Sequence, residues 1–323
     1  MAFLSVVTTV RATSQEDFRY GVYKSNGTAY IEKYIGSSAV VDVPSSIRAD
    51  SGDRDDEGNP IYRNYTVTCI SKYAFSGNVG ITQVSIPETI TDGSKLCIFA
   101  ECTNLREVNF KGVVRDIPTG MFSKCSNLRT LDLRWDSVES IGSEAFLDCG
   151  YDFGVLDYLP NVKTIGARAF GNVQTLTSVS LSSLTRIERE AFIGCGNLES
   201  VSVDGAGLRL EGGGEKDYYT YGPFARCPKL RTVKLGDGVV SIPYRLFYGS
   251  TNLETVILGR GITVANTVLR DLKNLTTVVA RGAMRVIPTG MFSKCSNLRT
   301  LDLRWDSVES IGSEAFLDCG YDF

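Results

Sequence analysis

One repeat of nearly constant length runs through most of this chain and constrains its fold more than any other feature. The segment from Ile117 to Leu133 shows one period: an Ile, an anchor Phe, a Cys three residues after the anchor, and a run of the form L-x-x-L-x-L. Anchors recur at intervals of 22 to 24 residues, with one interval of 32, and they are Phe75, Phe99, Phe122, Phe146, Phe170, Phe192, Phe224, Phe247, Leu269, Phe292 and Phe316. A fixed period of this kind indicates a stack of similar structural units.

Each period predicts one coil of a leucine-rich-repeat solenoid. In the segment 105–110, Val108 and Phe110 alternate with polar residues, which is the pattern of a strand with one buried face. The segment 142–149 around the next anchor has room for a short helical turn. A coil this short cannot bury its own apolar side, so neighbouring coils must stack on it. We therefore expect an α/β repeat: a leucine-rich-repeat solenoid of about 11 coils of 22–24 residues, with a parallel inner sheet and short helical or 3-10 turns outside.

The segments before the solenoid differ in composition from the repeats. Residues 1–16 hold an apolar run without a preceding basic region, which we interpret as an N-terminal tail or the remnant of a secretory signal. Residues 17–66 predict a small antiparallel β cap, because Asn26-Gly27 is a strong hairpin signal and a third strand, 39–43, ends at Pro44. The acidic stretch 48–60 is interpreted as a solvated insertion loop.

The solenoid is expected to occupy residues 67–323, and it contains an exact internal identity. Residues 117–153 and 287–323 have the same sequence over all 37 positions. Packing constraints alone would not preserve exposed positions such as Lys124 and Asp136, so a recent duplication or deliberate construction explains the identity better.

The cysteines follow the repeat rather than a disulfide or metal pattern. Seven of the nine stand three residues after an anchor, a position that Asn78, Val173, Ser250 and Leu272 fill in other coils. A position that accepts Val and Leu favours packed free thiols over disulfides. Zinc is disfavoured further, since the chain has no C-x-x-C motif and no histidine. The absence of histidine also removes the most common catalytic base, and we predict no cofactor or metal.

The charge of the chain argues against nucleic acid binding, and its hydropathy argues against a membrane span. The formal net charge is −3 and there is no Lys/Arg run to neutralise phosphates, so we expect no binding of nucleic acid. No apolar stretch approaches 18 residues, so no membrane span is predicted.

The repeat, together with the segments before it, resembles the BspA-like leucine-rich-repeat proteins. The motifs that carry the resemblance are Gly27–Ile31, Val43–Ile47 and Val67–Gly77 before the repeats, and Ile141–Cys149 and Ile187–Val203 within them. The resemblance covers residues 17–323; the acidic insertion and the long interval before Phe224 depart from the pattern. It implies a secreted or surface-exposed bacterial protein without catalytic residues, and some members of the family are adhesins for host or extracellular-matrix proteins.

Outward-facing residues of the inner strands predict a protein-binding patch on the concave face. Arg and Trp are favoured interface anchors, and charged and aromatic residues gather in the second to fourth coils at Glu107, Asn109, Lys111, Asp132, Arg134, Trp135 and Asp157. A glycine-rich loop with Tyr218, Tyr219 and Tyr221 is predicted as a second contact. The competing interpretations are an ordinary solvated sheet for the patch, and packing under the next loop for Trp135.

Two other functions remain open from the sequence. Asp132 and Asp157 occupy equivalent positions on neighbouring strands, which is compatible with a carbohydrate-active enzyme of the retaining type. Unpaired cysteines would also suit an intracellular repeat scaffold for protein–protein interaction. We favour a non-enzymatic surface or secreted protein that recognises a macromolecule.

Overall fold

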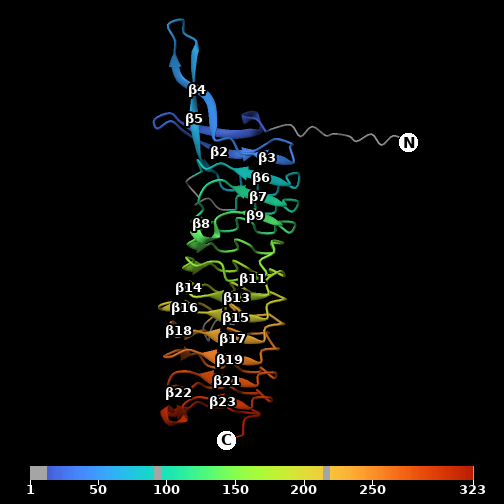
Figure 1. The fold of residues 1–323 in the computed structure, drawn as a ribbon, viewed down its shortest axis with the longest axis vertical. Helices are drawn as coiled ribbons and strands as arrows, with labels where there is room; N and C mark the ends of the chain where they lie inside the picture. Colours follow the sequence, from blue (N-terminus) through green and yellow to red (C-terminus); the bar gives the residue numbers. More distant parts are fainter. Residues whose placement is uncertain (1–12, 91–96, 214–218, 323) are drawn as a thin grey trace, which may run out of the picture.

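The computed structural model describes residues 13–90, 97–213 and 219–322, which form a long solenoid closed at its N-terminal end by a small sheet (Figure 1). Most coils contribute two short strands, one to each of two parallel sheets that run along the stack. The predicted leucine-rich-repeat solenoid with an N-terminal β cap is therefore confirmed.

The first sheet is formed by the alternating run after each Cys position, as predicted. All its strands pair in parallel, with equivalent residues of adjacent coils side by side, for example Val84, Val108 and Leu131. It is built in two parts: β3 (Val40–Asp42), β6 (Gln83–Ile86), β7 (Glu107–Phe110) and β9 (Thr130–Asp132), then β11 (Val155–Leu156), β13 (Ser178–Leu181), β15 (Ser200–Val203), β17 (Thr232–Leu235), β19 (Thr255–Leu258), β21 (Thr277–Ala280) and β23 (Thr300–Asp302).

A second parallel sheet, which the sequence did not predict, is formed around the Ile that precedes each anchor. Its strands have only two to four residues, and most place one buried apolar side chain in the core. They are β8 (Asp116–Ile117), β10 (Ser140–Ile141), β12 (Thr164–Ile165), β14 (Arg186–Ile187), β16 (Leu208–Leu210), β18 (Val239–Ile242) and β20 (Thr263–Val264), followed by the pair β22 (Val286–Ile287) and β24 (Ser310–Ile311). In the described ranges about nine turns therefore carry this strand, against the expected 11 coils.

The segments around the anchors are turns rather than helices. The described residues contain only three 3-10 segments, η1 (Gln15–Asp17), η2 (Trp135–Ser137) and η3 (Trp305–Ser307), and no α-helix. The reason is a left-handed residue on either side of the anchor, such as Glu144 (φ 56°) and Asp148 (φ 55°) around Phe146. Left-handed residues interrupt a right-handed helix after less than two turns.

The anchors stack into one aromatic column along the core. Ring centroids of neighbours from Phe75 to Phe224 are 5.1–5.8 Å apart, and the rings of Phe170 and Phe192 are parallel. The cap continues this column, because Tyr34 stacks on Phe75 at 5.7 Å and Phe18 meets the same ring edge-on. Stacking replaces water on both faces of each ring, so every coil stabilises its neighbours.

The Cys position forms a ladder of hydrogen bonds that the sequence did not reveal. Five of the six buried thiols donate to the carbonyl of the preceding anchor, as Cys125 Sγ does to Phe99 O at 3.1 Å, and Ser250 Oγ does the same to Phe224 O at 2.9 Å. No disulfide links any of the nine cysteines, all of which lie in the described part of the chain. Burial raises the pKa of the Cys102, Cys227 and Cys295 thiols to about 12, so they stay protonated donors.

An asparagine ladder runs beside the thiols at the start of the first sheet. Asn104 Nδ2 donates to Val79 O at 2.7 Å, and Asn127 and Asn197 make the same contact with the coil before them. Each amide donates a hydrogen bond to a backbone carbonyl that has no partner in a strand. Because the two groups belong to adjacent coils, these bonds fix the spacing between the coils.

The cap differs from the expectation in two respects. It consists of two antiparallel hairpins, β1 (Phe18–Tyr23) with β2 (Thr28–Tyr34) and β4 (Ser46–Arg54) with β5 (Pro60–Ile70), joined by parallel pairing of β2 with β5. The stretch 48–60, interpreted as a loop, is mostly strand and forms a projecting β-ribbon (Figure 1). The predicted third strand, β3, pairs with β6 and so begins the solenoid instead of completing the cap.

Candidate functional site

The predicted patch has its centre on the outer face of β6, β7 and β9. Pairing aligns Ser85, Asn109 and Asp132 in one row, and Gln83, Glu107 and Thr130 in another. Gln83 Nε2 donates to Glu107 Oε1 at 3.0 Å, which holds that carboxylate within its row. Asp132 is exposed, whereas Glu107 and Asn109 are half-buried. The structure therefore brings Glu107, Asn109 and Asp132 together on one rigid surface.

The patch does not continue to Asp157. The first sheet is interrupted between β9 and β11, which form separate stacks in the described part of the chain. The break follows the segment 150–154, which fits the repeat only with one inserted residue; in it Gly154 takes a left-handed conformation and Phe153 packs into the core. Asp132 and Asp157 are both exposed, but Asp132 ends β9 and Asp157 follows β11, and these two strands are not paired with each other.

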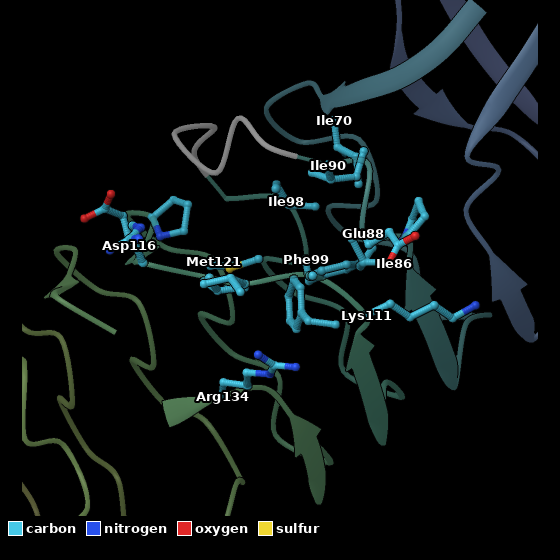
Figure 2. Close-up of a pocket in the computed structure, with 17 residues that line it drawn as sticks. Ile70, Ile86, Glu88, Ile90, Ile98, Phe99, Lys111, Asp116, Met121 and Arg134 are labelled. Atoms are coloured by element: carbon cyan, nitrogen blue, oxygen red, sulfur yellow. The ribbon is translucent and has the colours of Figure 1, made fainter. Parts of the chain in front are cut away.

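Lys111 and Arg134 stand at the ends of β7 and β9 and border a cavity between the two sheets (Figure 2). The cavity has a volume of about 680 Å³, and no feature of the sequence predicts it. Most of its walls are apolar, from Ile86, Ile90, Ile98, Phe99, Phe110 and Met121. Within the described ranges, neither Lys111 nor Arg134 forms an ion pair.

Trp135 lies outside the patch, and the alternative interpretation of packing applies to it. Its ring is half-buried among Phe146, Tyr151, Phe153 and Tyr158, with centroid distances of 5.6–6.2 Å. Burial of Tyr158 in this cluster raises the pKa of its hydroxyl. Because four rings hold the indole, Trp135 acts as a structural residue that closes the solenoid at the break in the first sheet.

The tyrosine loop lies several coils away, between β16 and β17. Tyr219 is 90% exposed, whereas the Tyr221 ring stacks on Tyr248 at 5.1 Å, and Tyr218 lies outside the described residues. Arg226 lies over the Tyr221 ring at 4.6 Å and donates to its hydroxyl at 3.0 Å. Arg245 also lies over these rings. The sequence pattern does not reveal either arginine, because they come from positions next to two different anchors that only stacking brings together.

The described residues contain no cluster of three His, Cys, Asp or Glu side chains that could hold a metal ion. A search of the same residues for a helix with the length and hydropathy of a bilayer span finds none.

Two parallel sheets, a Phe column and Cys and Asn ladders define a leucine-rich-repeat protein. The family described as the BspA type leucine rich repeat region (6 copies) matches residues 59–152, 155–209 and 220–322. The chain therefore belongs to the BspA-type leucine-rich-repeat family.

Solved structures show the same fold. A leucine-rich repeat protein from Bacteroides ovatus is 22% identical with a TM-score of 0.63, over 94% of this chain and 80% of that one. A leucine rich cell surface protein from Faecalibacterium prausnitzii is 20% identical with a TM-score of 0.50, over 92% of this chain and 97% of that one. A search of curated proteins finds no match.

Proposed function

We propose that this protein is a non-enzymatic recognition or adhesion protein, secreted or at the bacterial cell surface, that binds a protein partner of the host or extracellular-matrix class. Membership of the BspA-type family supports protein binding, and the similar fold of a cell surface protein from Faecalibacterium prausnitzii supports the location. The contact surface is the patch of Glu107, Asn109, Lys111, Asp132 and Arg134.

One observation carries the choice of surface. The patch combines an aligned polar row on a rigid sheet with two cations, Lys111 and Arg134, that have no carboxylate partner among the described residues. Several other described arginines on the solenoid surface are paired with carboxylates, such as Arg115 with Glu139 at 2.5 Å and Arg186 with Glu211 at 2.7 Å. Unpaired charges on a preformed surface can bind a partner's carboxylates without first breaking an internal ion pair or ordering a loop.

The tyrosine site is a second contact in this proposal. Tyr219 offers a large exposed amphipathic ring, and the Arg226–Tyr221 pair beside it is already ordered. Tyrosine supplies contact area at a small entropic cost. The distance along the solenoid between the two sites suits an extended macromolecule better than a small one.

The identical segments offer a matched experiment. Asp132→Ala with Arg134→Ala changes the patch, and Asp302→Ala with Arg304→Ala makes the same change where Val279 and Arg281 replace Asn109 and Lys111. We expect the first pair to reduce binding in a screen against matrix and surface proteins at least about tenfold, and the second pair to leave it intact. Trp135 stays unchanged, because its removal would disturb the aromatic cluster.

Equal binding by the wild type and both double variants would remove the patch from the proposal and direct attention to Tyr219 and Tyr221. The enzyme alternative is tested in parallel by a polysaccharide hydrolysis assay; activity that Asp132→Ala abolishes would overturn the non-enzymatic assignment. A cytosolic location of the native protein in fractionated cells would favour the scaffold alternative.

A further inference from the structure

We infer that the solenoid contains a weak joint, at which the three coils with anchors Leu269, Phe292 and Phe316 open together as one C-terminal unit. The joint lies between the coil that contains Phe247 and β19 and the coil that contains β20, Leu269 and β21. All residues on both sides of it, 239–280, belong to the described part of the chain. Three kinds of contact that connect other coils are absent between these two.

The column of anchor rings is interrupted at the joint. Leu269 replaces the Phe that stands at the other ten anchors. Among the described residues, the last stacked pair of anchor rings before the joint is Phe192 with Phe224, and the next pair is Phe292 with Phe316. A Leu side chain fills the core but forms no ring pair, so the additional stabilisation of such pairs is lost on both sides of Leu269.

The ladder of hydrogen bonds at the Cys position is interrupted at the same place. Leu272 occupies this position and has no donor, whereas Ser250 Oγ in the preceding coil donates to Phe224 O at 2.9 Å. Val173 also lacks a donor, but its anchor Phe170 is stacked on both faces. The joint lacks the ladder bond and the stacked ring together.

Backbone hydrogen bonds between the anchor turns are the third absent contact. Between most neighbouring coils, the anchor N–H donates to the carbonyl of the residue before the next anchor, as Phe146 N does to Ala169 O at 2.8 Å. In the described ranges, neither Phe247 N nor Gly249 N donates a backbone hydrogen bond to the coil of Leu269. The turn side of the joint is therefore not closed by the bonds that close the other coils.

The two sheets still connect the coils at the joint. β19 and β21 pair over four residues, whereas β18 and β20 pair over two. Within the described residues the second sheet ends at β20, because β22 pairs with β24 instead. In a stack where each coil contacts only its neighbours, separation at the weakest interface breaks fewer contacts than separation elsewhere. The coils beyond that interface should therefore open together.

Opening at the joint leaves both contact sites of the proposed function in place. The patch from Glu107 to Arg134 and the stack of Tyr221 on Tyr248 lie on the N-terminal side of the joint. The joint thus changes the length of the ordered solenoid without dismantling those sites, and it goes beyond the proposed function.

Native-state hydrogen exchange, followed by NMR in low concentrations of urea, tests the joint in the full chain. NMR also resolves the identical segments, in which the Leu131 amide of β9 and the Leu301 amide of β23 have the same sequence neighbours. We expect amides of β21 and β23 to exchange through one shared opening, at least about tenfold more frequent than the opening that exposes β17 or β9.

Paired variants repair the joint and copy it elsewhere. Leu269→Phe with Leu272→Ser restores a ring and a donor, and should slow exchange in β21 and β23 at least about tenfold. Phe192→Leu with Cys195→Leu removes a stacked ring and a ladder bond from another coil, and should create a second step in exchange between β13 and β15. Val173→Ser adds a donor where the rings are already stacked, and should leave β21 and β23 unchanged. Thermal melts followed by circular dichroism establish that each variant is folded.

Exchange rates that rise gradually from β17 to β23 would overturn the inference, because they would indicate fraying from the end of the stack. Wild-type exchange in the folded repaired variant, or no second step in the variant that copies the joint, would also overturn it. These outcomes do not affect the proposed function, because none of them measures the binding of a partner.

Discussion

The identical segments permit one substitution to be made twice, in the same sequence and in different surroundings. Phe146 and Phe316 are equivalent anchors, each preceded by Glu-Ala and followed by Leu-Asp-Cys. Phe146 is fully buried between Phe122 and Phe170, with both rings 5.5 Å away. Phe316 is half-buried and stacks on Phe292 at 5.3 Å. We predict that Phe146→Ala destabilises the protein much more than Phe316→Ala.

The expected magnitudes follow from burial and ring contacts. Removal of a fully buried Phe costs about 3–5 kcal/mol, from lost transfer free energy and the cavity left behind. Phe146 should be at the upper end, because it also meets Phe153 edge-on at 5.0 Å, and such aromatic pairs add about 0.5–1.5 kcal/mol. For Phe316, partial exposure both reduces the transfer free energy and lets water enter the vacated space, so we expect about 1–2 kcal/mol.

Urea unfolding followed by circular dichroism measures the two free energies, and native-state hydrogen exchange locates the damage. Since each coil contacts only its neighbours, exchange should rise mainly in the adjoining strands, β10 and β12 for Phe146→Ala and β24 for Phe316→Ala. Equal losses for the two variants would refute the reasoning, because sequence and not stacking would then determine the contribution of an anchor.

Three further predictions concern the ladder and the turns. Cys195→Val should lower the free energy of unfolding by less than about 1.5 kcal/mol in a denaturant titration, because Val173 fills the same position in another coil. Cys195→Ser should keep the hydrogen bond to the Phe170 carbonyl. A loss above about 3 kcal/mol for either variant would contradict this prediction. Burial raises the pKa of the Cys227 thiol to about 12, above the value near 9 in the unfolded chain, so its contribution is complete below pH 9 and is lost as pH rises from about 9 to 12. Urea midpoints should therefore fall above pH 9, and less steeply in Cys227→Ser; an identical slope would argue against the prediction. Thr267→Gly should stabilise the protein by about 0.5–1 kcal/mol, since a β-branched residue at φ 55° is strained. The control Thr263→Gly, in β20, should destabilise the protein. A lower melting temperature for both variants would exclude strain at Thr267.

Much of the fold could be predicted from the sequence because the same pattern occurs in every coil. The period gives the coils, the alternation in 105–110 gives the first sheet, and the exchange of Cys for Val and Ser gives free, packed thiols. The second sheet was missed for a physical reason. A strand of two residues, such as β10, has no periodicity of its own and exists only because its neighbours in the stack supply hydrogen-bond partners.

The candidate site was predicted less completely, because its parts depend on contacts between coils. Alternation along β7 and β9 predicts that Glu107, Asn109 and Asp132 face the same side, and strand pairing places Asn109 beside Asp132. Alternation could not show that Trp135 packs into an aromatic cluster, that the first sheet is interrupted before Asp157, or that Arg134 borders a cavity. Each of these features depends on which coil lies next, and the spacing within one coil does not contain that information.

The identical segments separate the two contributions most directly. The sequence by itself determined that both 117–153 and 287–323 form a coil, and both do, with 3-10 segments at Trp135 and Trp305. Tertiary structure decided the rest: Arg134 is extended at φ −79° and Arg304 is left-handed at φ 43°, and Ile141 is 1% exposed whereas Ile311 is 53% exposed. The coil that covers Ile141 has no counterpart beside Ile311 among the described residues. Local sequence sets the path of a coil, and burial, which stabilises that path, comes from its neighbours.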